Sequence, residues 1–373
     1  MATYAAVCLW NFKPLFTDEH VDNLENLATL TTLTGSIDES WFYLVSVAIE
    51  ARGAPILPLM LAAVQAARVN DASTVAACLR SFAERLDDLG TLLQRIHESC
   101  DPHVFYNRIR PFLAGSKNMA EAGLPNGVIY EDGTGTEKYR QYSGGSNAQS
   151  SLIQFFDIVL GIEHHPTGEK KDPSSESDLE GRAPPAKHNF LTEMRNYMPG
   201  PHRRFLEDVA NVANIREYVE AHSNNKTLTV AYDACLAMLR AFRDKHINIV
   251  SRYVIVKSRE SKSLARSTSP VATHRKVDIA SASRVDKNDP SSKKKLRGTG
   301  GTALIPFLKQ ARDETGEPAI DSWARRVMNR DLNTKGRGDF FLGKSEDQPA
   351  GLDLCGMAGT WTIDDNAGGL CHY

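Results

Sequence analysis

His246 is the residue of this sequence that is best suited to chemistry. It lies on one face of a long helical pattern in which apolar residues recur at spacings of three and four. The other members of this stripe are Tyr232, Cys235, Leu236, Leu239, Phe242, Ile249, Val250 and Tyr253. Because such a stripe packs into a core, the imidazole of His246 needs a partner there.

Two kinds of partner are open to this imidazole. The first is a backbone carbonyl or a neighbouring side chain, as for many core histidines. The second is a metal. No second histidine or cysteine stands at ligand spacing, and a single helical histidine suits a haem iron better than zinc. The residues alone leave both interpretations open.

A glycine-rich segment, residues 298–302 (GTGGT), precedes a predicted helix and can direct backbone N–H groups at an anion. It is not a phosphate loop, because the lysine and the spacing of that motif are missing. The preceding residues 258–297 hold eleven lysines or arginines against four acidic residues. We expect a solvated, disordered loop there, with an anion-binding or nucleic-acid-binding patch as the alternative.

The composition indicates a globular protein with one large domain or two ordinary ones. The chain has 373 residues, 41% hydrophobic and 24% charged, with a formal net charge of -2, and nothing in this balance requires nucleic acid or an anionic membrane. The longest apolar runs, residues 41–49 and 54–67, are too short for a membrane helix. Six scattered cysteines indicate free thiols and a cytoplasmic location.

Helical signals dominate, and clear strand alternation is absent. Ser36 and Glu39 form a capping box for a helix over residues 38–52, and a short helix from residue 101 is predicted to end at Pro111. Other helices are expected over residues 56–69, about 71–96, 147–161, 189–197, 201–209, 215–221, 228–257 and 303–313. The predicted fold class is all-α, a large helical bundle.

Irregular segments divide this bundle. Residues 114–148 are rich in Gly, Asn and Asp, and a long irregular stretch inside a compact domain is often functional. We predict one helical domain over residues 1–315 with flexible insertions at 163–188 and 258–297. Residues 316–373 show little periodicity and are predicted to form a poorly ordered extension.

Several unusual segments occur in a fixed order. They are residues 40–46 (SWFYLVS), 105–115 (FYNRIRPFLAG), 144–151 (GGSNAQSS), 193–199 (EMRNYMP) with His202 and Arg203, 231–235 (AYDAC), His246 and 298–302 (GTGGT). This succession resembles the indoleamine 2,3-dioxygenase family in its fungal type, from about Tyr4 to Thr315. The resemblance implies a helical domain that encloses a haem pocket.

The family comparison implies roles for three residues on the haem side. His246 matches the proximal ligand of a haem b, which leaves the other face of the iron open for dioxygen. Arg243, one turn earlier, matches a residue near the haem edge that pairs with the carboxylate corresponding to Asp157. Considered without the resemblance, Arg243 and Asp157 are equally well a structural ion pair.

The resemblance also places residues around the substrate. Phe42 and Ser46 are four residues apart and share a helix face, and Phe105 offers a flat apolar surface to an indole. Arg110 stands before Pro111, where the helix is expected to end, so its guanidinium is predicted to pair with an amino-acid carboxylate. Without the resemblance, the two phenylalanines are ordinary core and Arg110 is a surface cation.

The remaining matches lie in loops. Gly145, Ser146 and Asn147 match a segment beside the haem, where small side chains let the backbone approach; some members carry a smaller residue than Asn147. Thr299 matches a mobile-loop residue that closes over the ammonium and carboxylate of the substrate. The pocket lining at the start of the family's large domain corresponds to Tyr4, Val7 and Cys8.

The sequence departs from the family at both ends. Family members carry a small helical domain before the segment matching Tyr4, and this sequence lacks it. We therefore expect uncovered apolar surface, with instability or weak activity as the consequence. The extension after Thr315 has no counterpart that we can assign.

By the resemblance, the chain is a monomeric, haem-dependent dioxygenase that inserts dioxygen across the indole C2–C3 bond of L-tryptophan or a related indoleamine. N-formylkynurenine is the product, in tryptophan catabolism by the kynurenine pathway and NAD biosynthesis, and the electron donor is not identified. Ser46 is predicted to orient rather than to accept a proton. Alternatives are a haem-binding sensor or carrier, an inactive truncated homologue, and a helical interaction protein whose basic loop recruits a partner.

Overall fold

The computed structural model describes residues 2–117, 119–120, 123–131, 133–135, 138–167, 189–260, 298–299, 301 and 303–329. One compact unit covers Met1–Asn329. Its α-helices are α1 (Ile37–Gly53), α2 (Ile56–Arg68), α3 (Ala72–Gln94), α4 (Ile96–Ser99), α5 (Pro102–Val104), α6 (Arg110–Leu113), α7 (Ser151–Val159), α8 (Phe190–Met194), α9 (Gly200–Val212), α10 (Ile215–Ala221), α11 (Lys226–Val250), α13 (Leu304–Thr315) and α14 (Ser322–Asn329). The predicted all-α fold class is confirmed.

Shorter helical turns complete the bundle. Three have π-helical hydrogen bonding: η1 (Ala5–Leu9), η3 (Phe105–Ile109) and η8 (Ser251–Val256). Three are 3₁₀ turns: η2 (Leu24–Asn26), η5 (Asn147–Gln149) and η7 (Arg195–Tyr197). The η8 turn continues α11, so the helix that carries His246 extends as far as the sequence predicts.

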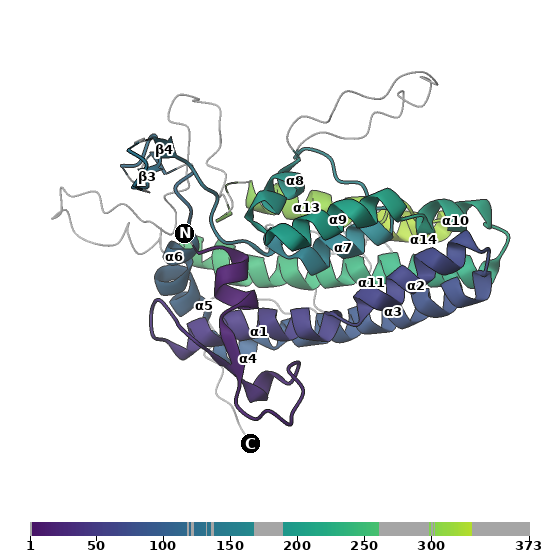
Figure 1. The fold of residues 1–373 in the computed structure, drawn as a ribbon, viewed down its shortest axis with the longest axis horizontal. Helices are drawn as coiled ribbons and strands as arrows, with labels where there is room; N and C mark the ends of the chain where they lie inside the picture. The colour runs from purple at the N-terminus through teal and green to yellow at the C-terminus, as the bar shows by residue number, and fades with distance from the viewer. Residues whose placement is uncertain are drawn as a thin grey trace, which may run out of the picture. The chain divides into compact units, whose positions relative to one another are not determined.

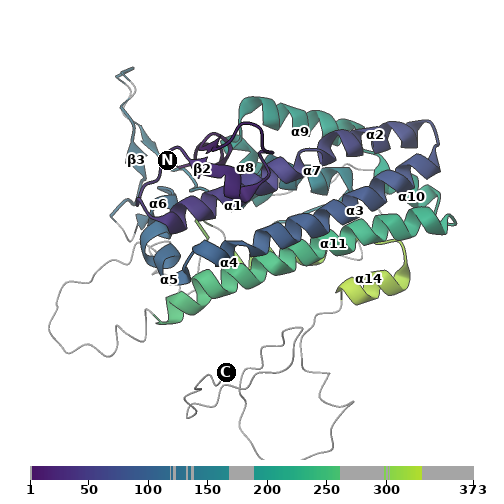
Figure 2. The ribbon, with the colours of Figure 1, turned by 90° about the horizontal axis from the view of Figure 1, so that it is seen from below.

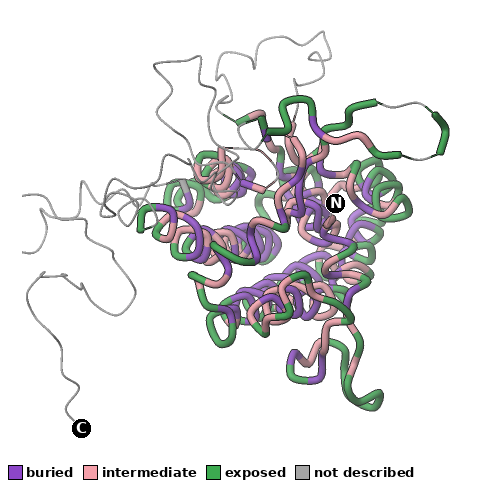
Figure 3. The backbone as a smooth tube through the Cα atoms, turned by 90° about the vertical axis from the view of Figure 1, so that its left-hand side faces the viewer, coloured by how far each residue is buried: buried purple, intermediate pink, exposed green. Residues whose placement is uncertain are grey.

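The centre of the fold is the pair of long helices α3 and α11, which lie side by side (Figures 1 and 2). Helices α1 and α2 pack against α3, and α13 packs against α11. Leu79 and Phe82 of α3 and Leu236 and Leu239 of α11 are completely buried. Figure 3 shows the buried residues on the helix sides that face one another, as the apolar stripes require.

Two short antiparallel strand pairs join the helices. Strand β1 (Phe12–Pro14) pairs with β2 (Leu27–Thr29), and β3 (Val128–Ile129) pairs with β4 (Tyr139–Arg140). Strands of two or three residues are too short to produce an alternating pattern, which explains why the sequence did not indicate them.

The prediction that Pro111 ends a helix is wrong. The backbone stays helical through η3 and α6, and Pro111 occupies the first turn of α6. A proline is tolerated there because the N–H that it lacks has no helical partner at that position. The π-helical turn before it shifts the hydrogen-bond register, so that α6 begins anew at Arg110.

The compact unit also extends beyond the predicted boundary at residue 315. Thr315 and Ala319 are completely buried, and α14 packs against α11. Both carboxylate oxygens of Asp233 on α11 accept hydrogen bonds, from the backbone N–H groups of Ile320 and Asp321 at 2.8 and 3.0 Å. The compact unit therefore runs to Asn329, and residues 330–373 lie outside the described part of the chain.

By length and composition alone, the helical stretch Ile37–Arg68 passes as a membrane span. The chain turns at residues 54 and 55, however, and divides this stretch into α1 and α2. Both helices bury apolar side chains against α3, among them Val47 and Met60. The stretch is therefore explained as two core helices.

Two other expectations concern cysteines and apolar surface. Cys8, Cys78, Cys100 and Cys235 are free thiols, as predicted, and all four are buried; Cys355 and Cys371 lie outside the described residues. Large apolar side chains are exposed along residues 10–33. They are Trp10, Leu15, Phe16, Val21, Leu30 and Leu33.

Candidate functional site

A cavity of about 260 Å³ lies between α1, α7, α11, α13 and the η3–α6 segment, and most of its lining is apolar. The structure brings all fourteen residues that the sequence indicated to this one cavity. They are Tyr4, Val7, Cys8, Phe42, Ser46, Phe105, Arg110, Gly145, Ser146, Asn147, Asp157, Arg243, His246 and Thr299. A mostly apolar cavity with a few converging polar groups is the usual form of a cofactor or substrate site.

His246 is half-buried, and it lines this cavity. Burial, and after it the positive charge of Arg243, lower the pKa of His246 to about 4, so the imidazole is neutral near pH 7. Within the described residues, neither ring nitrogen has a hydrogen-bond partner. A core histidine would form hydrogen bonds to backbone or side-chain groups of the protein. The structure therefore does not support this interpretation of His246.

Aromatic side chains form another part of the cavity lining. The rings of Phe42 and Phe105 are 4.8 Å apart between centroids, and Phe105 meets Tyr253 edge-on at 5.7 Å. Ser46, one turn after Phe42 in α1, interacts with the thiol of Cys8. Burial, with the nearby carboxylate of Glu50, raises the pKa of this thiol, so Cys8 stays protonated.

Arg110 is only 4% exposed, which differs from the surface cation that the residues alone suggested. Its guanidinium carbon lies 5.7 Å from the ring centre of Tyr106, a cation–π contact within the same helical segment. The sequence predicted that Arg110 lies at the end of a helix. In the structure the helical segment continues past Pro111, and Arg110 lines the cavity from within this segment.

The Gly144–Asn147 segment reaches the cavity by close backbone packing. The N–H of Gly144 donates to the carbonyl of Thr299 at 3.1 Å, and the Thr299 hydroxyl donates to the carbonyl of Gly145 at 2.7 Å. A Cβ atom on Gly144 would lie 2.0 Å from the carbonyl oxygen of Leu113. Glycine is therefore required at 144 because two backbone segments cross there.

Arg243 and Asp157 form the ion pair that the sequence predicted. The Nη2 atom of Arg243 donates to both carboxylate oxygens of Asp157, at 2.6 and 2.8 Å. Its Nη1 atom donates to the carbonyl of Ala311 at 3.3 Å and contacts the hydroxyl of Thr315. Burial alone would raise the pKa of Asp157, but Arg243 and His164 outweigh it and lower the value.

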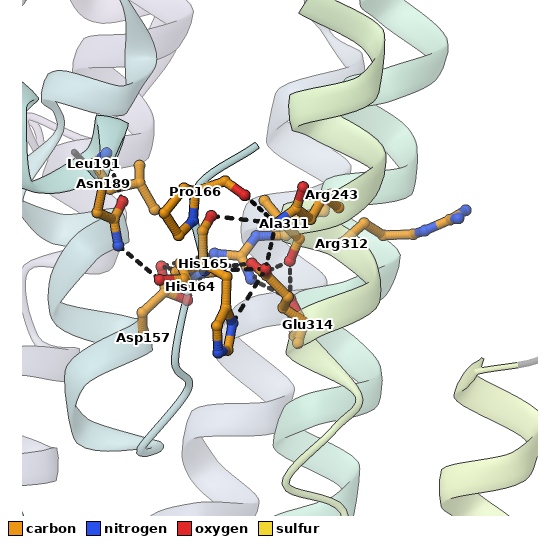
Figure 4. Close-up of polar contacts among 12 residues, drawn as sticks. Asp157, His164, His165, Pro166, Asn189, Leu191, Arg243, Ala311, Arg312 and Glu314 are labelled. Carbon is orange, nitrogen blue, oxygen red and sulfur yellow. Dashed lines mark hydrogen bonds and ion pairs between the residues drawn. The ribbon is translucent and has the colours of Figure 1, made fainter. Parts of the chain in front are cut away.

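Two polar residues near this pair were missed by the sequence reasoning. His164 and Glu314 lie beside Asp157 and Arg243 (Figure 4). His164 falls in residues 163–188, which were predicted to be a flexible insertion, and Glu314 lies one residue beyond the helix predicted over residues 303–313. The adjacent histidines 164 and 165 in a polar stretch are the only signal in the sequence that pointed to them.

A metal centre made of protein ligands alone is not found in the described residues, which contain no group of three or more His, Cys, Asp or Glu side chains placed to hold an ion. His246 is therefore a candidate for the single protein ligand of a metal cofactor. One protein nitrogen ligand is enough for a haem iron, whereas a zinc site takes three or four protein ligands.

Comparison with known proteins agrees with this site. A family model described as indoleamine 2,3-dioxygenase matches residues 1–318. The indoleamine 2,3-dioxygenase of Saccharomyces cerevisiae is 43% identical over 327 residues, 84% of this chain and 67% of the relative. The 6-hydroxytryptophan 2,3-dioxygenase of Fusarium equiseti is 36% identical over 315 residues (84% and 69%), and indoleamine 2,3-dioxygenase 2 of Mus musculus is 33% identical over 297 residues (80% and 62%).

The chain thus spans between 62% and 69% of the length of these three relatives. The family match covers all the helices that surround the cavity, from α1 to α13. The chain therefore belongs to the indoleamine 2,3-dioxygenase family and is an oxidoreductase of the dioxygenase class.

Proposed function

We propose that this chain is a haem-dependent dioxygenase that inserts dioxygen across the indole C2–C3 bond of L-tryptophan or a related indoleamine, with N-formylkynurenine as the product from tryptophan. The observation that carries the proposal is the ring of His246, which faces an apolar cavity and has no described hydrogen-bond partner. Relatives named for indoleamine and for 6-hydroxytryptophan support an indole as the ligand class.

The residues present fit a haem. His246 offers one neutral nitrogen ligand, and the mostly apolar lining suits a porphyrin. Arg243 reaches the same cavity one turn before His246, so its positive charge would lie near a haem held by His246. When bound, the haem supplies the activation of dioxygen.

The protein's own part is to bind and orient the amino acid. Phe42 and Phe105 present an aromatic wall to the indole ring. Arg110 brings a guanidinium, whose planar fork matches a carboxylate, to the same cavity. Thr299, whose hydroxyl bonds the carbonyl of Gly145 at the cavity, is proposed to contact the polar end of the substrate. Holding the indole in one orientation in a dry cavity supplies the positioning part of the catalysis.

Replacing Ser46 with alanine is expected to leave turnover within about tenfold of the original, because the loss of a general base costs ~10²–10⁴-fold. The hydroxyl of Ser46 meets the protonated Cys8 thiol, an arrangement that orients Ser46 but does not make it basic. Steady-state kinetics with tryptophan measures this, with Ser151→Ala as the control, since its hydroxyl contacts His202 at 2.7 Å. A variant that binds tryptophan but no longer turns over would contradict this role.

The proposal is tested with the purified chain supplied with haemin, a chemical reductant, oxygen and either tryptophan or 6-hydroxytryptophan. We expect a Soret band and an N-formylkynurenine-type product with both oxygen atoms derived from ¹⁸O₂, detected by mass spectrometry. A stable haem complex that forms no product from any indole would favour the sensor or carrier alternative. A chain that binds no haem would refute the proposal.

A further inference from the structure

His164 occupies a buried position between two carboxylates (Figure 4). Its Nδ1 atom lies 2.6 Å from an oxygen of Glu314 on α13, and its Nε2 atom lies 3.1 Å from an oxygen of Asp157 on α7. The Nε2 contact is close enough for an ion pair. The His164 side chain is 8% exposed.

Among the side chains in direct contact here, the charges balance only if the imidazole is protonated. Arg195, whose charge also acts on Asp157, donates its hydrogen bond to Gln154 instead. Asp157 and Glu314 carry two negative charges, and Arg243 supplies one positive charge. An unbalanced charge in a buried site is costly, so an imidazolium at His164 completes the set. Burial alone would lower the pKa of His164, but Asp157 and Glu314 outweigh it and raise the value.

The other polar groups around His164 support this arrangement. The backbone N–H of His165 donates to Glu314 at 3.0 Å, and the amide of Gln310 donates to the same carboxylate at 2.8 Å. The ring of His165 lies 3.5 Å from it. The charged neighbours of Glu314 in α13 have partners elsewhere: Arg312 binds Asp244 on α11 and its own neighbour Asp313.

We propose that His164, held as an imidazolium between Asp157 and Glu314, is a positioning residue that fixes the C-terminal end of α13 against the Asp157–Arg243 pair at the cavity. Its effect on catalysis rests on the proposed function. Arg243 also bonds the carbonyl of Ala311 on α13, and the Thr299 segment lies just ahead of that helix. A loosened α13 therefore disturbs both Arg243 and the Thr299 segment.

This role has a defined pH dependence. The pKa of His164 is raised in the folded protein, so the protonated imidazole contributes its stabilisation fully below the ordinary histidine range. The contribution is lost as the pH rises through the folded value. Asp157 and Glu314, whose pKa values are lowered, stay ionised over that range. The anchoring of α13 is thus expected to weaken on the alkaline side.

The proposal is tested by hydrogen exchange of the α13 amides in the full chain without haem. Exchange rates are measured from about pH 6 to about pH 9 and are corrected for the intrinsic effect of pH on amide exchange. At the lower pH, His164→Gln is expected to speed α13 exchange by about tenfold or more, because a buried carboxylate loses its counter-charge. The matched control is His222→Gln, because the His222 ring lies outside this cluster: it bonds the carbonyl of Tyr218 at 2.8 Å and packs against the ring of the same residue. It should exchange as the unmodified chain does.

Glu314→Gln provides a second test that does not depend on the first variant folding. It removes one negative charge, so a neutral His164 then balances the cluster and the alkaline loss of α13 protection should disappear. The double variant H164Q/E314Q should exchange several-fold more slowly than H164Q, since its charges balance again. Unchanged α13 protection in H164Q, or an alkaline loss that persists in E314Q, would overturn the proposal.

The KM of the haem-loaded enzyme provides a separate measurement. The KM for tryptophan is expected to rise on the alkaline side in the unmodified enzyme, and H164Q should remove this pH dependence while H222Q keeps it. If the chain never turns over tryptophan, the proposed function fails, and the exchange result still decides the role of His164.

Discussion

Replacing His246 with alanine is expected to abolish the retention of haem. The loss in affinity should exceed about a hundredfold, because removing even the groups that orient a metal ligand costs ~10–100-fold, and this change removes the ligand itself. The measurement is the Soret absorption that remains after haemin reconstitution and gel filtration, titrated to give an apparent Kd.

The fold should survive this change, since the His246 ring has no described hydrogen-bond partner whose loss would matter. Circular dichroism and thermal unfolding of the haem-free protein check this point. His222→Ala is the control for the loss of one histidine, and it should keep the Soret band. If H246A bound haem with undiminished affinity, another group would be the ligand and the proposed site would be wrong.

The second large effect is expected at the Asp157–Arg243 pair. Asp157→Ala should lower the free energy of unfolding by about 3 to 5 kcal/mol, because the buried guanidinium of Arg243 loses the carboxylate that pairs with it directly. Asp157 is only 5% exposed, and its bidentate contact with Arg243 is not screened by solvent. Urea unfolding of the haem-free chain measures the difference.

Two further variants show whether the buried pair itself causes the loss. Asp157→Leu combined with Arg243→Met removes both charges and should recover much of the stability. Asp87→Ala is the control for an exposed pair, since Asp87 is 69% exposed and lies 3.9 Å from Lys245; it should cost no more than about 1 kcal/mol. An equally small cost for D157A would show that the Asp157–Arg243 pair is not a buried one in solution.

Local signals in the sequence accounted for most of the helices. The sequence offers Asp71 or Ser73 as the cap of α3, and Asp71 is the one that caps it, by accepting from the N–H of Thr74. The capping box was half right: Ser36 accepts from the N–H of Glu39, but the Glu39 carboxylate accepts from Leu33 and Thr34 instead. Caps are short-range, so they can be read from sequence, but the partner of a long side chain depends on the surrounding fold.

Such local signals predicted only part of the candidate site. Periodicity alone singled out His246, and the other cavity residues came from the resemblance to a family, because their roles depend on contacts between distant segments. His164 shows the limit most clearly. Its surrounding sequence is polar and reads as a linker, yet its ring is buried by partners on α7 and α13. No local sequence pattern predicts a contact between residues as far apart in the chain as His164 and Glu314.

The same long-range pairing constrains when the cavity can form. The contact between His164 and Glu314 joins positions 150 residues apart, and that between Asp157 and Arg243 joins positions 86 apart. During synthesis, α7 therefore emerges from the ribosome long before the helices that neutralise its buried carboxylate. The charged end of the cavity can therefore form only after Glu314 and Thr315 have left the ribosome exit tunnel, near the end of the synthesis of the 373-residue chain.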